Sequence, residues 1–233
     1  MKTYLEKKKV FITGTTNGIG RALALMLLKN GSQVIAHGRS GELLEDLVLT
    51  AGPGNITTVI GDLGAGEGWQ AVDNAIKTTQ PEILVLNAGY NCRKSHVSGW
   101  TNTEIMEMLQ VNMISPIMFA RTFAGLPQAE EPRRLAIILS TSCISPRPTM
   151  SLYVAAKTGL MGFGKVMQLE AKELGVLTTL FYPGRTNSNF RKTPNPAYMS
   201  PKSVAQTVIS ILNLPPDIVP FEFTFRPRID TAI

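Results

Sequence analysis

The chain has 233 residues, of which 44% are hydrophobic, so it is long enough to bury one large core. Lysine and arginine exceed aspartate and glutamate by 23 − 17 = 6, but apart from residues 7–9 this charge is scattered, which argues against a nucleic-acid-binding stripe. No apolar run is long enough to span a bilayer and no signal-peptide core precedes the first apolar run, so we expect a cytoplasmic protein that does not enter membranes. The two histidines and two cysteines lack metal-ligand spacing, so we expect no metal site and read Cys92 and Cys143 as free thiols.

Short apolar runs alternate with amphipathic stretches along the chain. The apolar runs predict strands at 10–13, 33–37, 56–60, 83–86, 135–139, 176–182 and 222–225. The amphipathic stretches predict helices at 21–29, 42–49, 69–79, 104–123, 153–174 and 201–212. Alternating strands and helices indicate a parallel sheet covered on both faces. We therefore expect an α/β, Rossmann-type doubly wound fold with a mainly seven-stranded parallel sheet, in a single domain over residues 1–233.

A glycine-rich turn joins the first predicted strand to the first predicted helix. Glycines let the backbone turn tightly and approach a pyrophosphate, which the helix N-terminus then holds. A second turn of small residues, 87–89, lets the backbone lie close to a flat ligand. The strand, turn and helix context therefore predicts a dinucleotide site, with contacts from Gly14, Thr16, Asn17, Gly18, Ile19 and Gly20.

The loop after the second predicted strand carries Arg39 and no acidic residue. In a dinucleotide fold this position meets the adenosine ribose, where an acid would bind the 2′-hydroxyl and repel a 2′-phosphate. A guanidinium fork suits phosphate instead. The sequence therefore favours NADP(H) over NAD(H), with His37 and Ser40 near enough to assist, and a solvated loop arginine is the alternative interpretation.

The predicted helix 104–123 contains Asn112 and Pro116, with Thr101 or Thr103 as its expected N-cap. Pro116 predicts a kink or interruption. Asn112 lies among apolar residues, where its amide is costly to bury without hydrogen-bond partners. It is either a functional residue or a core asparagine that ties the kink together.

Tyr153 and Lys157 are four residues apart in an Ala-rich predicted helix, so their side chains lie on one face. A phenol with a pKa near 10 is a poor acid or base at neutral pH, and a neighbouring ammonium lowers that pKa. Bringing the pKa close to 7 requires about 4 kcal/mol of preferential stabilisation of the phenolate, at about 1.36 kcal/mol per pH unit. Ser140 ends the fifth predicted strand, where a hydroxyl can hydrogen-bond a substrate oxygen as charge develops on it. Taken alone, such a pair is more often an ordinary surface pair.

Together these motifs resemble the single-domain branch of the short-chain dehydrogenase/reductase family, over residues 13–226. The matches are the TGxxxGxG turn that begins at Thr13, the Asn-Ala-Gly turn at 87–89, the Pro-Gly turn at 183–184, and the thirteen-residue step from serine to tyrosine in the YxxxK site. The resemblance implies four catalytic residues: Asn112, Ser140, Tyr153 and Lys157. Beyond the glycine-rich turn, it implies cofactor contacts from Arg39, Asp62, Leu63, Asn87, Ala88, Gly89, Tyr153, Lys157, Pro183, Gly184 and Ser188.

The resemblance also implies a role for each catalytic side chain. Tyr153 passes a proton to or from the substrate oxygen while hydride moves between the nicotinamide and the carbonyl carbon. Lys157 lowers the Tyr153 pKa and binds the nicotinamide ribose, Ser140 polarises the carbonyl, and Asn112 holds a water that links Lys157 to solvent. Ser142 is a second hydroxyl that competes for the role of Ser140, but its step to Tyr153 is two residues short. We therefore expect an oxidoreductase acting on a carbonyl or secondary alcohol.

Three segments after the carboxyl edge of the predicted sheet are expected to set the substrate: 90–99, 143–150 and 185–199. The last is polar and interrupted by prolines, so we expect a substrate loop that closes as a lid. These segments contain an excess of cations, Lys94, Arg191 and Lys192 among them. As a hypothesis, this excess suits a negatively charged or polar small-molecule carbonyl, although such loop cations more often point into solvent. The candidate substrate residues are Tyr90, Arg93, Ser142, Cys143, Arg147 and Arg185.

The predicted helix 153–174 contains Gly159, Gly162 and Gly164. Each weakens a helix by up to about 1 kcal/mol relative to alanine. Close packing against another helix would account for them, so we expect a subunit interface in a homodimer or homotetramer.

Three other functions are compatible with parts of the sequence. A catalytically idle NADP(H)-binding regulator or redox sensor would keep the fold, although all four catalytic side chains are present here. A nucleic-acid or membrane-surface binder would rest on net charge alone. A sugar epimerase or dehydratase of the family's longer branch is disfavoured by chain length and glycine spacing.

Overall fold

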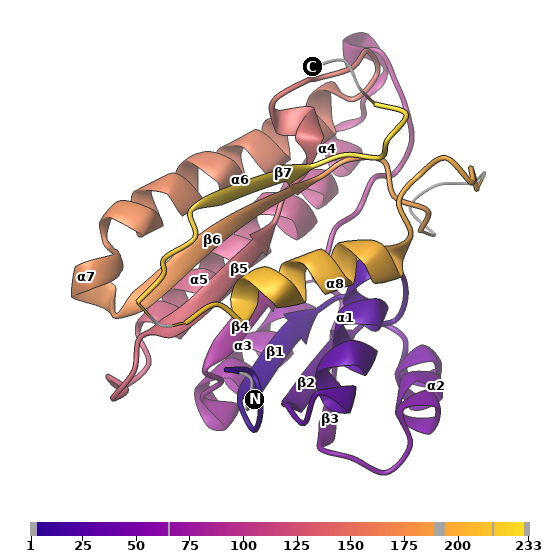
Figure 1. Ribbon diagram of the computed structural model, residues 1–233. Helices are drawn as coiled ribbons and strands as arrows, with labels where there is room; N and C mark the ends of the chain where they lie inside the picture. Colours follow the sequence, from indigo (N-terminus) through magenta and orange to yellow (C-terminus); the bar gives the residue numbers. More distant parts are fainter. Residues whose placement is uncertain (1–3, 65, 189–193, 216, 231–233) are drawn as a thin grey trace.

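Seven parallel strands form one sheet in the order β3-β2-β1-β4-β5-β6-β7, as the computed structural model shows (Figure 1). The structure describes residues 4–64, 66–188, 194–215 and 217–230. The strand order reverses direction beside β1, which places a crevice at the carboxyl ends of β1 and β4. The strands are β1 (Lys9–Thr13), β2 (Gln33–Gly38), β3 (Ile56–Ile60), β4 (Ile83–Leu86), β5 (Arg133–Ile138), β6 (Val176–Pro183) and β7 (Glu222–Phe225).

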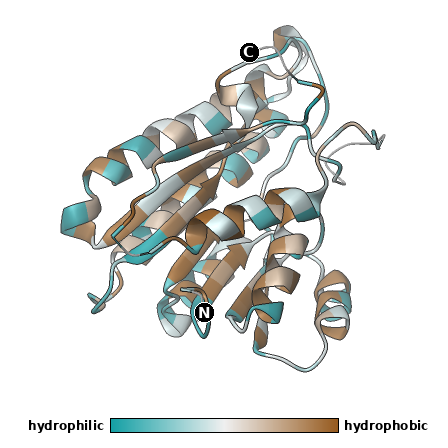
Figure 2. Ribbon diagram, viewed as in Figure 1, coloured by the Kyte–Doolittle hydropathy of each residue, from teal (hydrophilic) through white to brown (hydrophobic). Residues whose placement is uncertain are grey.

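Helices cover both faces of the sheet. Apolar side chains of α1, α2 and α8 pack on one face and those of α3, α5 and α6 on the other, in two separate core clusters. Figure 2 shows the central strands in the colours of hydrophobic residues, as expected for strands buried on both faces. The predicted doubly wound fold is confirmed. These helices are α1 (Gly18–Lys29), α2 (Gly41–Ala51), α3 (Gly68–Thr79), α5 (Ser115–Ala124), α6 (Ser151–Leu169) and α8 (Pro201–Leu212).

The predicted helix 104–123 is three successive helical segments. It starts as α4 (Asn102–Leu109), where Thr101 and Glu104 form a capping box. A π-helical turn follows at Gln110–Ile114, and α5 begins immediately before Pro116. The interruption expected at the proline therefore lies just before it, in the turn that contains Asn112.

The three glycines of α6 have different surroundings. A Cβ built at Gly159 would lie 2.5 Å from the Met113 sulfur, and one at Gly164 would lie 2.6 Å from Leu180 Cδ2. These two glycines therefore allow close packing inside the chain. Their presence in α6 does not require a subunit interface. Only Gly162 is open: among the described residues, no atom lies within 4 Å of its Cβ position.

The predicted helix 153–174 also ends earlier than expected. It is interrupted at Glu170, and α7 (Ala171–Leu174) leads into β6. Within the described parts of the chain, no helix is long and apolar enough to cross a membrane.

Candidate active site

The glycine-rich turn after β1 is built so that only glycine fits at its critical positions. Gly14 has φ +75°, in the left-handed region, and a Cβ there would lie 2.9 Å from Ala88 Cα. A Cβ at Gly20, the third residue of α1, would lie 2.1 Å from the Gly14 carbonyl oxygen and 2.5 Å from Asn87 Nδ2. The turn therefore packs directly on the residues that follow β4.

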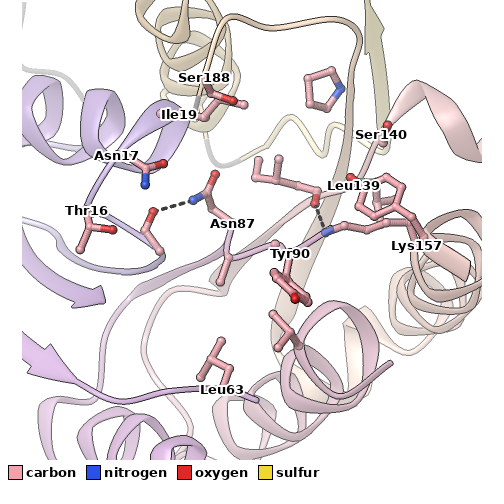
Figure 3. Close-up of a pocket in the computed structure, with 18 of the residues that line it drawn as sticks. Thr16, Asn17, Ile19, Leu63, Asn87, Tyr90, Leu139, Ser140, Lys157 and Ser188 are labelled. Atoms are coloured by element: carbon pink, nitrogen blue, oxygen red, sulfur yellow. Dashed lines mark hydrogen bonds between the residues drawn. The ribbon is translucent and has the colours of Figure 1, made fainter. Parts of the chain in front are cut away.

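Asn87 joins the two turns by hydrogen bonds. Its Nδ2 donates to the carbonyl oxygens of Thr13 and Gly14, both at 3.0 Å. Figure 3 draws one of these two hydrogen bonds as a dashed line. In return, the Thr13 hydroxyl oxygen accepts from the backbone N–H groups of Asn87 and Ala88, each at 3.0 Å. The ends of β1 and β4 are thus held as one rigid floor of the cleft.

His37, at the end of β2, supports this floor from beneath. Its ring is buried, with Nδ1 accepting from the Gly14 N–H at 3.3 Å and Nε2 lying 2.9 Å from the Gly61 carbonyl oxygen. Because an N–H can only donate, the imidazole is neutral with its proton on Nε2. Burial lowers the pKa of His37 from 6.5 to about 4. The sequence offered His37 only as an assistant to Arg39 at the cofactor, whereas in the structure it supports the turn.

The nucleotide end of the cleft has features that fit a phosphate-bearing cofactor. Among the described residues, the Asn17 side chain caps no amide of α1, so the N–H groups at that helix end remain available to an anion. Arg39 is exposed and lines the same cleft, together with Asp62 and Leu63. The donor set is therefore two-fold: a helix N-terminus for a pyrophosphate and a guanidinium for a further phosphate.

The catalytic end of the cleft is formed by β5 and α6. Lys157 is buried, and its Nζ donates to the Ile138 carbonyl oxygen at 3.1 Å (Figure 3). Burial lowers the pKa of Lys157 to about 8. The Tyr153 side chain, 7% exposed, lines the cleft together with Lys157 and Ser140.

Ser140 and Ser142 form one hydroxyl pair. The Ser140 hydroxyl donates to Ser142 Oγ at 3.1 Å and accepts from the Ser142 backbone N–H at the same distance. Both serines line the cleft. Ser142 therefore hydrogen-bonds Ser140 rather than standing apart as a competing hydroxyl.

Asn112 lies beneath the cleft rather than in its wall. Its side-chain oxygen accepts from the Tyr90 N–H at 3.1 Å, and its Nδ2 donates to the carbonyl oxygens of Tyr90 (2.8 Å) and Met108 (3.0 Å). The buried amide is thus satisfied, and it fixes the backbone just after the 87–89 turn. A Cβ at Gly89 would lie 3.4 Å from Asn112 Oδ1 and 3.7 Å from Lys157 Nζ, so the three residues are close neighbours.

The remaining predicted cofactor residues lie around the same cleft. Two of the predicted cofactor and catalytic residues do not line the cleft. Gly20 is buried beneath the glycine-rich turn, and Asn112 is buried beneath Tyr90. Sequence reasoning did not single out Glu107 and Met150, which also line the cleft. The predicted residues found in its lining are Gly14, Thr16, Asn17, Gly18, Ile19, Arg39, Asp62, Leu63, Asn87, Ala88, Gly89, Ser140, Tyr153, Lys157, Pro183, Gly184 and Ser188.

The predicted substrate residues divide into two groups. Tyr90 and Ser142 line the cleft. Cys143 lies outside its lining and is half-buried, packed at the edge of the core, where burial raises the pKa of its thiol. Arg147 is exposed and also lies outside the lining.

Of the other predicted cations, two are paired with acids, Lys94 is exposed outside the cleft lining, and two fall outside the described residues. Arg93 is paired with Glu104, at 2.6 Å between Nε and Oε1, and Arg185 with Asp230, at 3.3 Å. Arg191 and Lys192 fall outside the described residues, as does the middle of the predicted substrate loop 185–199. At the base of that loop, the Asn187 side chain exchanges two hydrogen bonds with the backbone of Asn195.

A parallel doubly wound sheet with a glycine-rich turn at its carboxyl edge defines an α/β dinucleotide-binding protein. The profile of the short chain dehydrogenase family matches residues 8–198. The chain therefore belongs to the short-chain dehydrogenase/reductase family of oxidoreductases, as its motifs predicted.

Relatives of known sequence agree with this membership. The oxidoreductase YvrD of Bacillus subtilis is 30% identical over 188 residues, which cover 80% of this chain and 71% of that protein. The short-chain type dehydrogenase/reductase y4eK of Sinorhizobium fredii is 31% identical over 184 residues, which cover 78% of this chain and 71% of that protein.

Solved structures share the fold. An alcohol dehydrogenase from the archaeon Thermococcus sibiricus, complexed with 5-hydroxy-NADP, superposes with a TM-score of 0.84 at 21% identity, covering 97% of this chain and 99% of that one. A short chain dehydrogenase from Burkholderia cenocepacia in complex with NADP superposes with a TM-score of 0.84 at 23% identity, covering 95% and 97% of the two chains.

Proposed function

We propose that this protein is an NADP(H)-dependent oxidoreductase that transfers a hydride between the cofactor and a carbonyl or secondary alcohol. The observation that carries the proposal is that one cleft is lined both by Tyr153, Lys157 and Ser140 and by the glycine-rich turn that begins at Gly14. One end of that cleft fits a dinucleotide, and the other offers a phenol, an ammonium and a hydroxyl. When bound, NADP(H) supplies or accepts the hydride at its nicotinamide ring.

Each catalytic side chain has a role that its environment supports. Tyr153 gives a proton to the carbonyl oxygen during reduction and takes it back during oxidation. With a pKa of about 8, Lys157 is mostly charged at pH 7, and its ammonium stabilises the phenolate. Ser140 donates a hydrogen bond to the substrate oxygen, for which it exchanges its contact with Ser142.

Asn112 acts by positioning. Both amide hydrogens are used, on Tyr90 and Met108, so the side chain holds the backbone beside Gly89 in place. This arrangement supports a role in shaping the cleft floor rather than a direct step in proton transfer.

The preference for NADP(H) rests on Arg39. Its exposed guanidinium lines the nucleotide end, where a 2′-phosphate gains a charge-assisted hydrogen bond. The NADP complexes of the two solved structures above support this choice of cofactor.

The test is a panel of ketones and secondary alcohols with NADPH, NADH and their oxidised forms, followed at the nicotinamide absorbance. Tyr153→Phe is expected to lower kcat by at least roughly 100-fold, because it removes the general acid–base. It should leave the Kd for NADPH within a few-fold of the wild-type value. Tyr182→Phe is the matched control: this phenol donates to Glu222 outside the cleft, so its loss should leave turnover intact.

Two results would contradict the proposal. Turnover by Tyr153→Phe at the wild-type rate would remove the phenol from the mechanism. Tight NADPH binding without turnover of any substrate in the panel would favour a catalytically idle cofactor-binding protein.

A further inference from the structure

Two of the cations that the sequence places near the substrate, Arg93 and Arg185, are paired with acids. The Arg93 guanidinium contacts Glu104 through two nitrogens, at 2.6 and 2.9 Å, and also donates to the Gly99 carbonyl oxygen at 2.5 Å. Its Cζ lies 5.2 Å from the centroid of the Trp100 ring. Arg93 therefore fastens the loop after β4 to the start of α4, and its charge is paired with the carboxylate of Glu104.

Arg185 is held in a similar way and lies outside the lining of the cleft. It pairs with Asp230, whose side chain is 12% exposed, and lies over the Tyr198 ring at 5.6 Å. Moving Arg185 to a substrate would leave a mostly buried carboxylate without its partner, which is costly. The ion pair thus fastens the base of the substrate loop to the segment after β7.

Most of the charged side chains that line the cleft lie at its nucleotide end. Within the described lining these are Arg39, Asp62, Glu107 and Lys157. Arg39 and Asp62 follow β2 and β3, and a Cβ at Gly64 would lie 3.5 Å from both Asp62 Oδ1 and Glu107 Cγ, so these three belong to the nucleotide end. Only Lys157 remains at the catalytic end, buried and bonded to the Ile138 carbonyl oxygen.

The wall beside Tyr153 is apolar. Its ring packs in a cluster with Met108 and Leu152, and the partly buried members of that cluster include Tyr90 and Met150, which line the cleft. Burial, reinforced by the carboxylate of Glu107, raises the pKa of the Tyr90 phenol, so this residue presents a neutral aromatic surface. The other partly buried members are Cys92, Trp100, Ile105 and Leu109.

From this arrangement we propose that the substrate is a neutral ketone, or the matching secondary alcohol, with an apolar or aromatic substituent that packs against Tyr90 and Met150. The inference rests on the proposed function and names its substrate class. A substrate carboxylate at this end would lose water, and the one cation there within the described lining, Lys157, is buried and bonded to the Ile138 carbonyl oxygen. In the forward reaction the carbonyl carbon gains a hydride, the oxygen gains the Tyr153 proton, and NADPH is oxidised to NADP+.

This proposal replaces the expectation of a negatively charged substrate. That expectation counted cations along the sequence; the structure pairs Arg93 and Arg185 with acids and leaves Arg147 exposed outside the cleft.

The experiment compares each neutral keto ester with its own free acid, for example ethyl benzoylformate with benzoylformate and ethyl acetoacetate with acetoacetate. Each pair shares one reacting carbonyl and differs in charge. We expect kcat/KM with NADPH to favour the esters by roughly 100-fold, because an uncompensated buried charge costs several kcal/mol. Met150→Lys places a cation in the apolar wall and should lower the ester-to-acid ratio of kcat/KM at least roughly ten-fold. Arg147→Gln is the matched control and should leave the ratio unchanged.

The outcomes separate this inference from the function on which it rests. Equal or better turnover of the free acids overturns the substrate class while leaving the reductase assignment intact. If Arg185→Gln then removes that preference, Arg185 leaves Asp230 to bind the acids. Failure of every ester and acid, with NADPH still bound, refutes the proposed function and this inference with it.

Discussion

Replacing His37 by glutamine tests whether the cofactor turn depends on a neutral buried imidazole. In the wild-type structure the ring accepts from the Gly14 N–H and donates to the Gly61 carbonyl oxygen. Protonation would turn Nδ1 into a second donor facing an N–H donor, so the folded state disfavours the charged form. Burial is the main cause of the lowered pKa, and it is opposed only in part by the hydrogen bond to Gly61 and, to a smaller extent, by the carboxylate of Asp62.

The magnitude follows from the two pKa values. In the folded protein the pKa of His37 is lowered from 6.5 to about 4, so between these values the unfolded chain binds the extra proton. The stability that His37 contributes is therefore complete above pH 6.5 and falls as the pH drops toward 4. At about 1.36 kcal/mol per pH unit the full loss is about 3 kcal/mol, of which about 2 kcal/mol is reached by pH 5.

The assay is urea unfolding at pH 7, 6 and 5 for the wild type, His37→Gln and His96→Gln. At pH 7 we expect His37→Gln to be less stable by about 1–3 kcal/mol, because two buried hydrogen bonds are disturbed. That deficit should shrink by about 2 kcal/mol at pH 5, since the variant has no imidazole to titrate. His96 is exposed, so its variant should follow the wild type. Parallel pH dependence in the wild type and His37→Gln would refute the reasoning.

Three further predictions follow from contacts described above. Gly164→Ala should destabilise the fold by about 1–3 kcal/mol in thermal or urea unfolding, because its Cβ would lie 2.6 Å from Leu180 Cδ2. Apart from its own helix, Gly162→Ala meets no described atom within 4 Å and should raise stability by up to about 1 kcal/mol; a clear loss in the same assay would reveal a neighbour outside the described residues. Arg39→Asp should lower the ratio of kcat/KM for NADPH over NADH at least roughly ten-fold, because a carboxylate repels a 2′-phosphate and binds a 2′-hydroxyl; an unchanged ratio removes Arg39 from cofactor choice.

The fold could be predicted from the sequence because its signals are local. Apolar runs and glycine spacing located every strand of the sheet to within a few residues. The largest discrepancy is β5, which begins at Arg133 and not at Leu135. Arg134 is buried because its guanidinium donates to the carbonyl oxygens of Leu212 and Leu214, contacts that no local pattern contains.

The candidate site was predictable where residue spacing alone places groups together, as for Tyr153 and Lys157. The site was not predictable where a charged side chain pairs with a residue that is distant in the sequence. The sequence offered Arg185 as a candidate substrate residue, and only the folded chain brings Asp230 to it. For the same reason the support that His37 gives to Gly14 lies beyond a reading of nearby residues.

Asn112 binds both backbone groups of Tyr90 and so fixes the chain at the point where it leaves the cleft floor. Downstream of that anchor, residues 91–99 supply no side chain to the described lining, although Cys92 packs against the cluster that contains Tyr153. Exchanges at Cys92 can therefore adjust the wall from behind without replacing a residue that lines the cleft. A lineage, or an engineer, can diversify selectivity there at little risk to the chemistry.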